Sequence, residues 1–124
     1  MAGFKLEIWK NNNSRRLKTE YPTLRSALKA AYEKMHGKTG PDNISIIHGF
    51  NFVGYVHWGT IDDGPWKNYT KIVVDLDGSL SGDGFYIRAD GSVTPTELHK
   101  WYKSKKHPLY KPYKYDQFKK LLKE

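Results

Sequence analysis

The sequence predicts an α+β fold, a single domain spanning residues 1–124 with a mainly antiparallel sheet of about five to six strands. One helix is expected after an N-terminal hairpin and two more at the C-terminus, in the order ββα-ββββ-αα. Two observations predict this class. The chain has 124 residues, the size of one ordinary domain. Its strand-like and helix-like segments also follow one another without an internal repeat or a linker.

The N-terminal segment predicts a β-hairpin. Phe4, Leu6 and Ile8 recur with the two-residue period of a half-buried strand. Residues 11–14 are turn-forming, and a return strand is expected through residues 17–21.

A helix is predicted directly after this hairpin. Thr23 follows Pro22 and is a suitable N-cap, and apolar side chains then recur at helical spacing as far as Met35. Gly37 provides a stop signal.

Strand-forming segments fill the middle of the chain. Residues 44–47 and 69–76 contain runs of β-branched side chains, and residues 85–89 precede a hairpin turn at residues 90–91. These segments favour antiparallel strands with short connections.

Residues 50–58 predict a further strand with apolar side chains on both faces, as expected of a central position in the sheet. Strict alternation assigns five residues to one face: Phe50, Phe52, Gly54, Val56 and Trp58.

Capping chemistry predicts the next helix. Thr94, with Pro95 in the first helical position, is expected to begin a helix that buries Leu98, Trp101 and Tyr102.

Residues 109–115 follow Pro108 and contain Pro112, and they are expected to be extended. A short amphipathic helix should then bury Phe118, Leu121 and Leu122.

The net charge of +8 points to an anionic partner, and its distribution is uneven. Residues 1–40 hold nine basic and three acidic side chains, a net of +6, and residues 41–99 hold three and eight, a net of −5. Residues 100–124 hold nine and two, a net of +7. Two basic ends therefore flank an acidic middle. Alternatively, this separation of charges has no role in binding, and the charged side chains only form a solvated surface.

The C-terminal segment 100–124 is basic and aromatic. Rings interleaved with lysines can stack on unpaired bases while neutralising phosphates, so this segment predicts nucleic-acid binding. The expected contacts are Lys103, Lys105, Lys106, Tyr110, Lys111, Tyr113 and Lys114. Alternatively, the rings Trp101, Tyr110, Tyr113 and Phe118 dock the segment onto the sheet while the lysines face water. His99 is expected to add pH-dependent positive charge.

Arg15 and Arg16 follow the predicted hairpin turn, where they could contact a nucleic-acid backbone or groove. Exposed arginines in turns are also common as solubilising groups. Because lysines outnumber arginines 17 to 4, sequence-specific readout is the weaker form of this hypothesis. The first functional hypothesis is thus a non-catalytic basic protein that binds nucleic acid or a nucleoprotein complex.

The acidic middle supports an alternative of a different class. Its loops could occupy the basic cleft of a nucleic-acid-processing enzyme, as expected of an inhibitor from a phage or mobile element. The residues expected to carry this interaction are Asp62, Asp63, Asp77 and Asp83.

A third hypothesis is a metal-dependent nuclease that uses Asp75, Asp77 and His57. Asp75, Asp77 and Asp83 could supply oxygen ligands for a divalent ion. Their spacing fits no template, so turn formation is the favoured interpretation, and no metal site is assigned. His48 and His57 lie on neighbouring predicted strands and could approach one another as an acid–base pair.

Composition excludes several classes. The chain has no cysteine, which removes disulfides, thiol catalysis and the common structural zinc sites. No apolar run approaches the roughly 20 residues that cross a bilayer, and the first residues lack a signal-peptide core, so we expect a cytoplasmic protein with no membrane partner. No dinucleotide or phosphate-cradling motif is present, so no cofactor and no enzymatic activity are expected.

Overall fold

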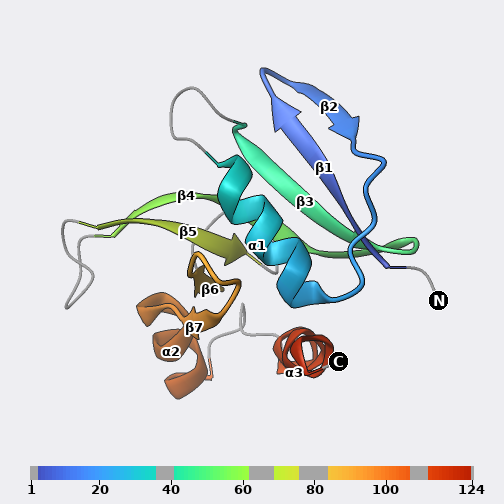
Figure 1. Cartoon of the computed structure of the whole chain (residues 1–124). Helices are drawn as coiled ribbons and strands as arrows, with labels where there is room; N and C mark the ends of the chain where they lie inside the picture. The colour runs from blue at the N-terminus through green and yellow to red at the C-terminus, as the bar shows by residue number, and fades with distance from the viewer. Residues whose placement is uncertain (1–2, 36–40, 62–68, 76–83, 107–111, 124) are drawn as a thin grey trace.

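The structure is a computed structural model that describes residues 3–35, 41–61, 69–75, 84–106 and 112–123. Seven strands form one sheet in the order β2-β1-β3-β4-β5-β6-β7, and every neighbouring pair is antiparallel (Figure 1). The strands are β1 (Phe4–Lys10), β2 (Asn13–Arg16), β3 (Asn43–His48), β4 (Asn51–Ile61), β5 (Tyr69–Asp75), β6 (Phe85–Ile87) and β7 (Val93–Pro95). The helices are α1 (Leu24–Lys34), α2 (Glu97–Ser104) and α3 (Pro112–Leu122). The predicted α+β class and the order of its elements are confirmed.

The first hairpin turns more tightly than expected. Asn11 and Asn12 have φ values of 51° and 68°, the left-handed pair that a two-residue hairpin turn requires and that asparagine tolerates. The return strand β2 therefore begins at Asn13 and ends at Arg16. The chain then stays close to β1, because Tyr21 and Phe4 exchange backbone hydrogen bonds of 2.8 Å in each direction.

Helix α1 begins as the sequence predicts. The Thr23 side chain accepts a hydrogen bond from the Ser26 backbone N–H, and the Ser26 hydroxyl accepts one from the Thr23 N–H, which completes a capping box. The helix ends at Lys34, and Met35 caps it with a buried side chain.

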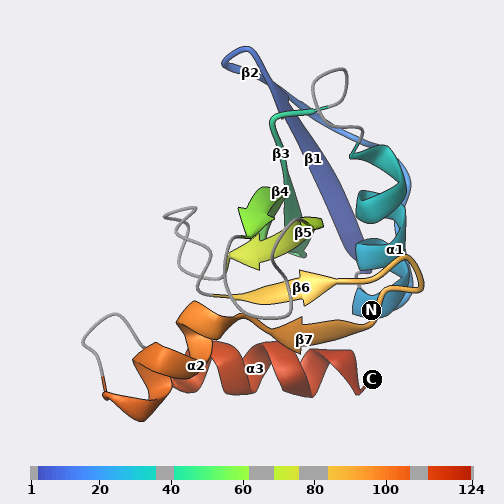
Figure 2. The same ribbon diagram turned by 90° about the vertical axis from the view of Figure 1, so that its left-hand side faces the viewer.

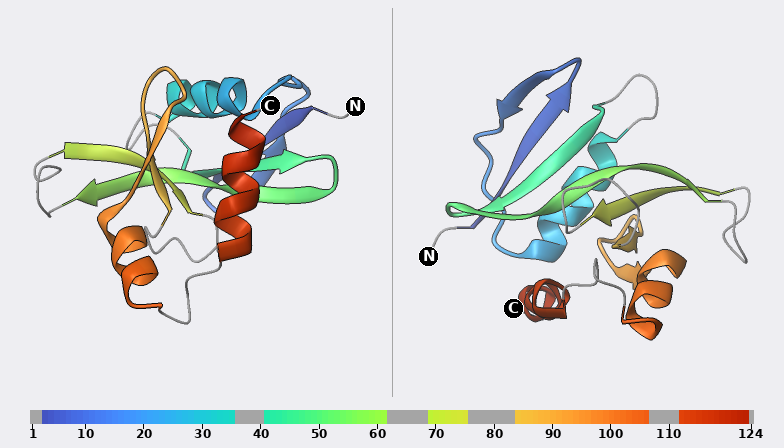
Figure 3. Two further views of the ribbon diagram at one scale, coloured as in Figure 1. Left: turned by 90° about the horizontal axis from the view of Figure 1, so that it is seen from below. Right: turned by 180° about the vertical axis from the view of Figure 1, so that it is seen from behind.

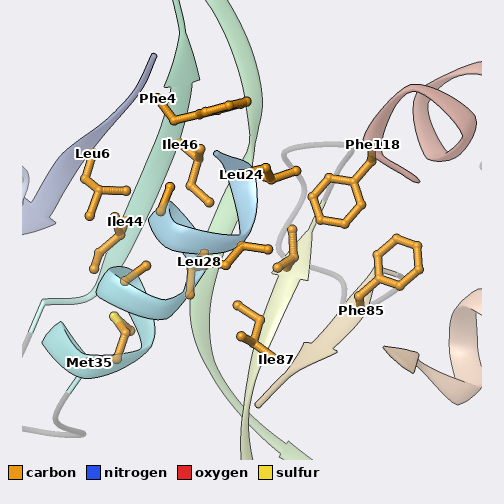
Figure 4. Close-up of a cluster of buried hydrophobic side chains, with 14 of the residues drawn as sticks. Phe4, Leu6, Leu24, Leu28, Met35, Ile44, Ile46, Phe85, Ile87 and Phe118 are labelled. Carbon is orange, nitrogen blue, oxygen red and sulfur yellow. The ribbon is translucent and has the colours of Figure 1, made fainter. Parts of the chain in front are cut away.

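The core lies between the sheet and its helices. Figure 4 shows Leu24 and Leu28 of α1 between the strand residues Ile44 and Ile46 and the ring of Phe118. The fully buried side chains include Leu6, Leu24, Leu28, Ile44, Ile46, Val56, Val74, Phe85, Tyr115 and Phe118. Because these residues come from β1, β3, β4, β5, β6, α1 and α3, burial of one apolar cluster holds both ends of the chain together.

The sheet twists strongly along its length. In Figure 2, β6 and β7 run across the direction of β1, and α2 and α3 lie beside them, at the end of the sheet remote from β2. The strands present one face to the helices, because the inward residues of β3, β4, β5 and β6 all join the same cluster as α1 and α3. We call this the core face.

A β-bulge corrects the predicted faces of β4. The register with β3 shifts between Ile46 and Ile47, so that Ile46 pairs with Gly54 while Ile47 pairs with Phe52, and Val53 is the extra residue. Val53 packs against the core, whereas Phe52 is 46% exposed. Strict alternation therefore assigns Gly54 and Val56 to the correct face of the sheet and Phe52 to the wrong face.

The seventh strand exceeds the five to six expected. Thr94 and Pro95, predicted to start a helix, instead pair with Tyr86 and Phe85 in the edge strand β7, where proline is tolerated. Helix α2 starts two residues later, with Thr96 as its N-cap accepting from the His99 N–H at 3.1 Å.

The segment before the last helix is also corrected. Residues 112–115 were expected to be extended, but they form the first turn of α3, which starts at Pro112. Proline is favoured at this position because its missing N–H would be unpaired there in any case. The remaining expected extended residues, 109–111, lie outside the described residues.

Candidate nucleic-acid interface

Helix α2 carries the clearest basic surface. Lys100, Lys103, Lys105 and Lys106 are exposed on this helix and directly after it. Trp101 lies among them and is 50% exposed, which corrects the expectation that the helix buries this ring. We call these five residues the α2 basic surface.

His99 points the opposite way. It is 2% exposed, and its ring lies 4.2 Å from that of Tyr115 and 5.1 Å from that of Phe85, measured between centroids. Two residues along a helix rotate the side-chain direction by about 200°, so Trp101 faces outward when His99 faces inward. The expectation that His99 adds exposed charge is therefore wrong, because its ring is enclosed by aromatic side chains.

The end of α2 concentrates cations. The Lys105 N–H donates to the Trp101 carbonyl at 3.0 Å, and Lys106 has a φ of 50°. A left-handed conformation costs a side-chain-bearing residue about 1–2 kcal/mol, which is why glycine is common there. Positive charge at a helix C-terminus offsets part of this cost by interacting with the helix dipole.

Other predicted contacts in the C-terminal segment are only partly located. Tyr110 and Lys111 lie outside the described residues. Tyr113 and Lys114 belong to the first turn of α3, where the structure describes their backbone but not their side chains. Phe118 stacks on Phe85 with centroids 5.1 Å apart, so this ring of the segment docks on the sheet as the alternative interpretation expects.

Arg15 and Arg16 are both exposed on β2, next to the predicted turn. They lie on opposite faces of the sheet, since Arg15 pairs with Ile8 and Arg16 with Glu7. A guanidinium nitrogen of Arg16 lies 3.5 Å from a carboxylate oxygen of Glu7. The two arginines therefore do not form one contact patch.

The face of β1, β3 and β4 opposite the core face is a feature that sequence reasoning missed. Figure 3, right, views the molecule from behind, and none of the described helices lies in front of these strands. The strand registers place nine residues on it: Lys5, Glu7, Trp9, Asn43, Ser45, Ile47, Phe52, Tyr55 and His57. We call it the open face.

Aromatic rings follow one another across the open face. The Trp9 indole N–H donates to Ser45 Oγ at 3.1 Å, and Ser45 pairs with Tyr55 on β4. The Tyr55 ring in turn lies 4.7 Å from that of Phe52, with the planes inclined by 56°. At the β3–β4 turn, Phe50 is fully exposed. Rings thus extend from β1 to the end of the β3–β4 hairpin.

The acidic candidates lie almost entirely outside the described residues, and the histidine candidates do not form a pair. Asp62, Asp63, Asp77 and Asp83 lie outside the described residues, and Asp75 ends β5. His48 pairs with Asn51 and His57 with Asn43, at opposite ends of the β3–β4 ladder. The proposed histidine pair is therefore wrong, because the register separates the two rings. Within the described part of the chain, no three His, Cys, Asp or Glu residues are grouped to hold a metal ion.

Comparison with protein-family models, with curated proteins and with solved structures finds no match to this chain. Among the described helices, none is long and apolar enough to span a membrane. We therefore infer the function from two features of the structure, which are a basic helix with an outward tryptophan and a sheet face lined with aromatic rings.

Proposed function

We propose that this protein binds nucleic acid, free or within a nucleoprotein complex, and acts without catalysis. The α2 basic surface is the contact. The observation that carries the proposal is the half-exposed ring of Trp101 among four exposed lysines. Burying a large apolar side chain stabilises a protein by about 1.5–3 kcal/mol, so an outward tryptophan contributes less to folding stability than a buried one would.

The chemistry of this surface fits a polyanion that carries aromatic bases. An indole can stack on any base, while lysines neutralise phosphates at separate points. No acidic residue interrupts the sequence from Leu98 to Lys106. Lys103 in the last turn of α2, with Lys105 and Lys106 directly after it, brings positive charge to the negative end of the helix dipole, which offsets the repulsion of phosphate there.

The proposed binding is insensitive to base sequence. Lysine presents a compact, rotating charge, whereas specific readout of guanine and clamping of phosphate favour the planar fork of arginine. All four cations of the α2 basic surface are lysines. Affinity should therefore depend on salt and on the number of phosphates more than on base identity.

The test compares two triple variants with equal loss of charge. Replacing Lys103, Lys105 and Lys106 with glutamine should weaken binding to an oligonucleotide at least tenfold and reduce the salt slope by about 0.7 per lost phosphate contact. The control replaces Lys29 and Lys34 on α1 and Lys123 after α3. It should leave affinity within about threefold of the unmodified protein, because the charges lie outside the contact.

A third variant separates stacking from charge. Trp101→Ala should lower the affinity for single strands about tenfold while the salt slope stays constant, since the indole contacts no phosphate. The proposal fails if the unmodified protein binds neither DNA nor RNA at about 50 mM salt, or if the control triple variant loses as much affinity as the α2 variant.

A further inference from the structure

The open face has an aromatic surface that packing of the core does not explain. Phe52 is 46% exposed and Phe50 is fully exposed. In the same hairpin, the apolar side chains of Ile44, Ile46 and Val56 are completely buried. Exposed apolar side chains that gather in one place mark an interaction site. On this hairpin they gather at the turn and along one face.

The bulge in β4 is what directs Phe52 outward. Without it, alternation from Val56 and Gly54 would place Phe52 on the core face. Val53 occupies the inward position instead and packs against the core. Bulges often re-aim side chains at functional sites. Here the outcome is a Phe52 ring packed on Tyr55 at the surface.

The rings span the sheet in a way that suits separate bases. Trp9 on β1 and Tyr55 on β4 lie two strands apart and two residues apart along the strands, which corresponds to about 12 Å between their backbones. Ser45 lies between them, only 4% exposed, and its hydroxyl accepts from the Trp9 indole, which fixes the direction of that ring. Both rings are partly exposed. Bases that are unstacked from each other can each meet one ring, whereas paired bases inside a duplex cannot.

The charge beside these rings is complementary to a phosphate backbone. Residues 4–18, which include β1 and β2, contain five cations and one carboxylate, a net of +4. Lys5 lies on the open face itself, in one cross-strand row with Ile47 and Phe52. Glu7, the carboxylate, is paired with Arg16. Of the cations in β1 and β2, Lys5 and Arg16 lie on the open face, whereas Lys10 and Arg15 lie on the opposite face of the sheet. With Glu7, the open face therefore has a net charge of +1 on these two strands, which is the charge that a phosphate crossing them would meet.

We propose that the open face binds unpaired nucleobases, with Phe52 and Tyr55 as one stacking position, Trp9 as a second, and Phe50 extending the surface at the hairpin turn. This inference rests on the proposed nucleic-acid binding and adds its substrate class, single-stranded DNA or RNA. The platform ends before β6, because Tyr86, in the same cross-strand row as Trp9, is only 4% exposed.

The experiment measures affinity for a thymine oligonucleotide, a uracil oligonucleotide and a duplex of equal charge. Phe50→Ala with Phe52→Ala should lower the affinity for single strands by about tenfold or more and leave the duplex affinity unchanged, because only unpaired bases stack on these rings. The thymine and uracil arms distinguish DNA from RNA as the source of the bases. Thermal unfolding and near-ultraviolet circular dichroism of the variant establish that it is folded.

A second measurement locates the bases directly. Ultraviolet crosslinking of the thymine oligonucleotide, followed by trypsin, should label the peptide of residues 39–67, which contains Phe50, Phe52 and Tyr55. Labels confined to α2, or equal losses of single-strand and duplex affinity in the double variant, would overturn the inference and leave the proposed function standing. Absence of binding by the unmodified protein would instead refute the proposed function.

Discussion

Gly91, in the turn between β6 and β7, lies against the backbone carbonyl of Arg25 on α1. A Cβ atom at position 91 would be 2.5 Å from that oxygen. The Arg25 side chain reaches the same turn, with its Nε donating to the Asp90 carbonyl at 3.1 Å and its Nη2 lying 3.3 Å from the Asp90 carboxylate. The first helix is thus tied to the far end of the sheet at a point where only glycine fits.

Replacing Gly91 with alanine should destabilise the protein by more than the left-handed conformation alone. Gly91 has a φ of 85°, and the same substitution at Gly49, with a φ of 65°, provides a control with open space around the new methyl group. The control should cost about 1–2 kcal/mol of unfolding free energy. Gly91→Ala should cost at least about 1 kcal/mol more, because helix and turn must separate. Urea unfolding measures both, and equal losses would refute the close approach.

The pKa of the Asp90 carboxyl should lie below its ordinary value of 3.8. The main cause is the hydrogen bond from the Ser92 hydroxyl, followed by the Ser92 backbone N–H, with a smaller contribution from the Arg25 guanidinium. A lowered pKa in the folded state means that the charged form contributes stability above pH 3.8, and that this contribution is lost as the pH falls through the lower folded value.

Ser92→Ala should raise that pKa toward 3.8, and Arg25→Gln should raise it less. NMR titration of the Asp90 carboxyl measures each shift. A larger effect of the Arg25 variant would contradict the order of causes.

Local chemistry was sufficient to predict β1 and α1, but the return strand expected through residues 17–21 is β2 at Asn13–Arg16. Phe4, Leu6 and Ile8 read correctly as a strand, and Thr23 caps α1 as expected, because both patterns depend only on neighbours in sequence. The helix start predicted at Thr94 and Pro95 was wrong because it depends on a contact distant in sequence. Both residues have the chemistry of a helix start, but they pair with β6 instead, and Thr96 provides the capping hydroxyl of α2.

The candidate site was predicted only in part. Exposed lysines on α2 follow from charge, but the outward direction of Trp101 depends on His99 filling the space beside Phe85 and Tyr115, a tertiary contact. The open face was missed because strict alternation sends Phe52 to the core. A bulge has no signature in this sequence, and its effect appears only once β3 and β4 are paired.

Phe52→Ala should cost little stability. The 46% exposed ring loses its contact with the Tyr55 ring, and such a ring pair is worth about 0.5–1.5 kcal/mol. The same substitution at Phe85, which is 2% exposed on β6, should cost about 3–5 kcal/mol. Thermal or chemical unfolding compares the two variants. A loss at Phe52 as large as that at Phe85 would mean that Phe52 belongs to the core and that the open face lacks this ring.

Two rings of the C-terminal segment should also differ in their effect on stability. Phe118 is 2% exposed and stacks on Phe85, so Phe118→Ala removes a core side chain and should cost about 3–5 kcal/mol. Trp101 is 50% exposed, so Trp101→Ala should cost less than about 1 kcal/mol. Because Trp101 is also the proposed stacking residue of α2, this variant should retain its unfolding midpoint while losing affinity for single strands. A large loss of stability in Trp101→Ala would instead place that ring in the core and remove it from the interface.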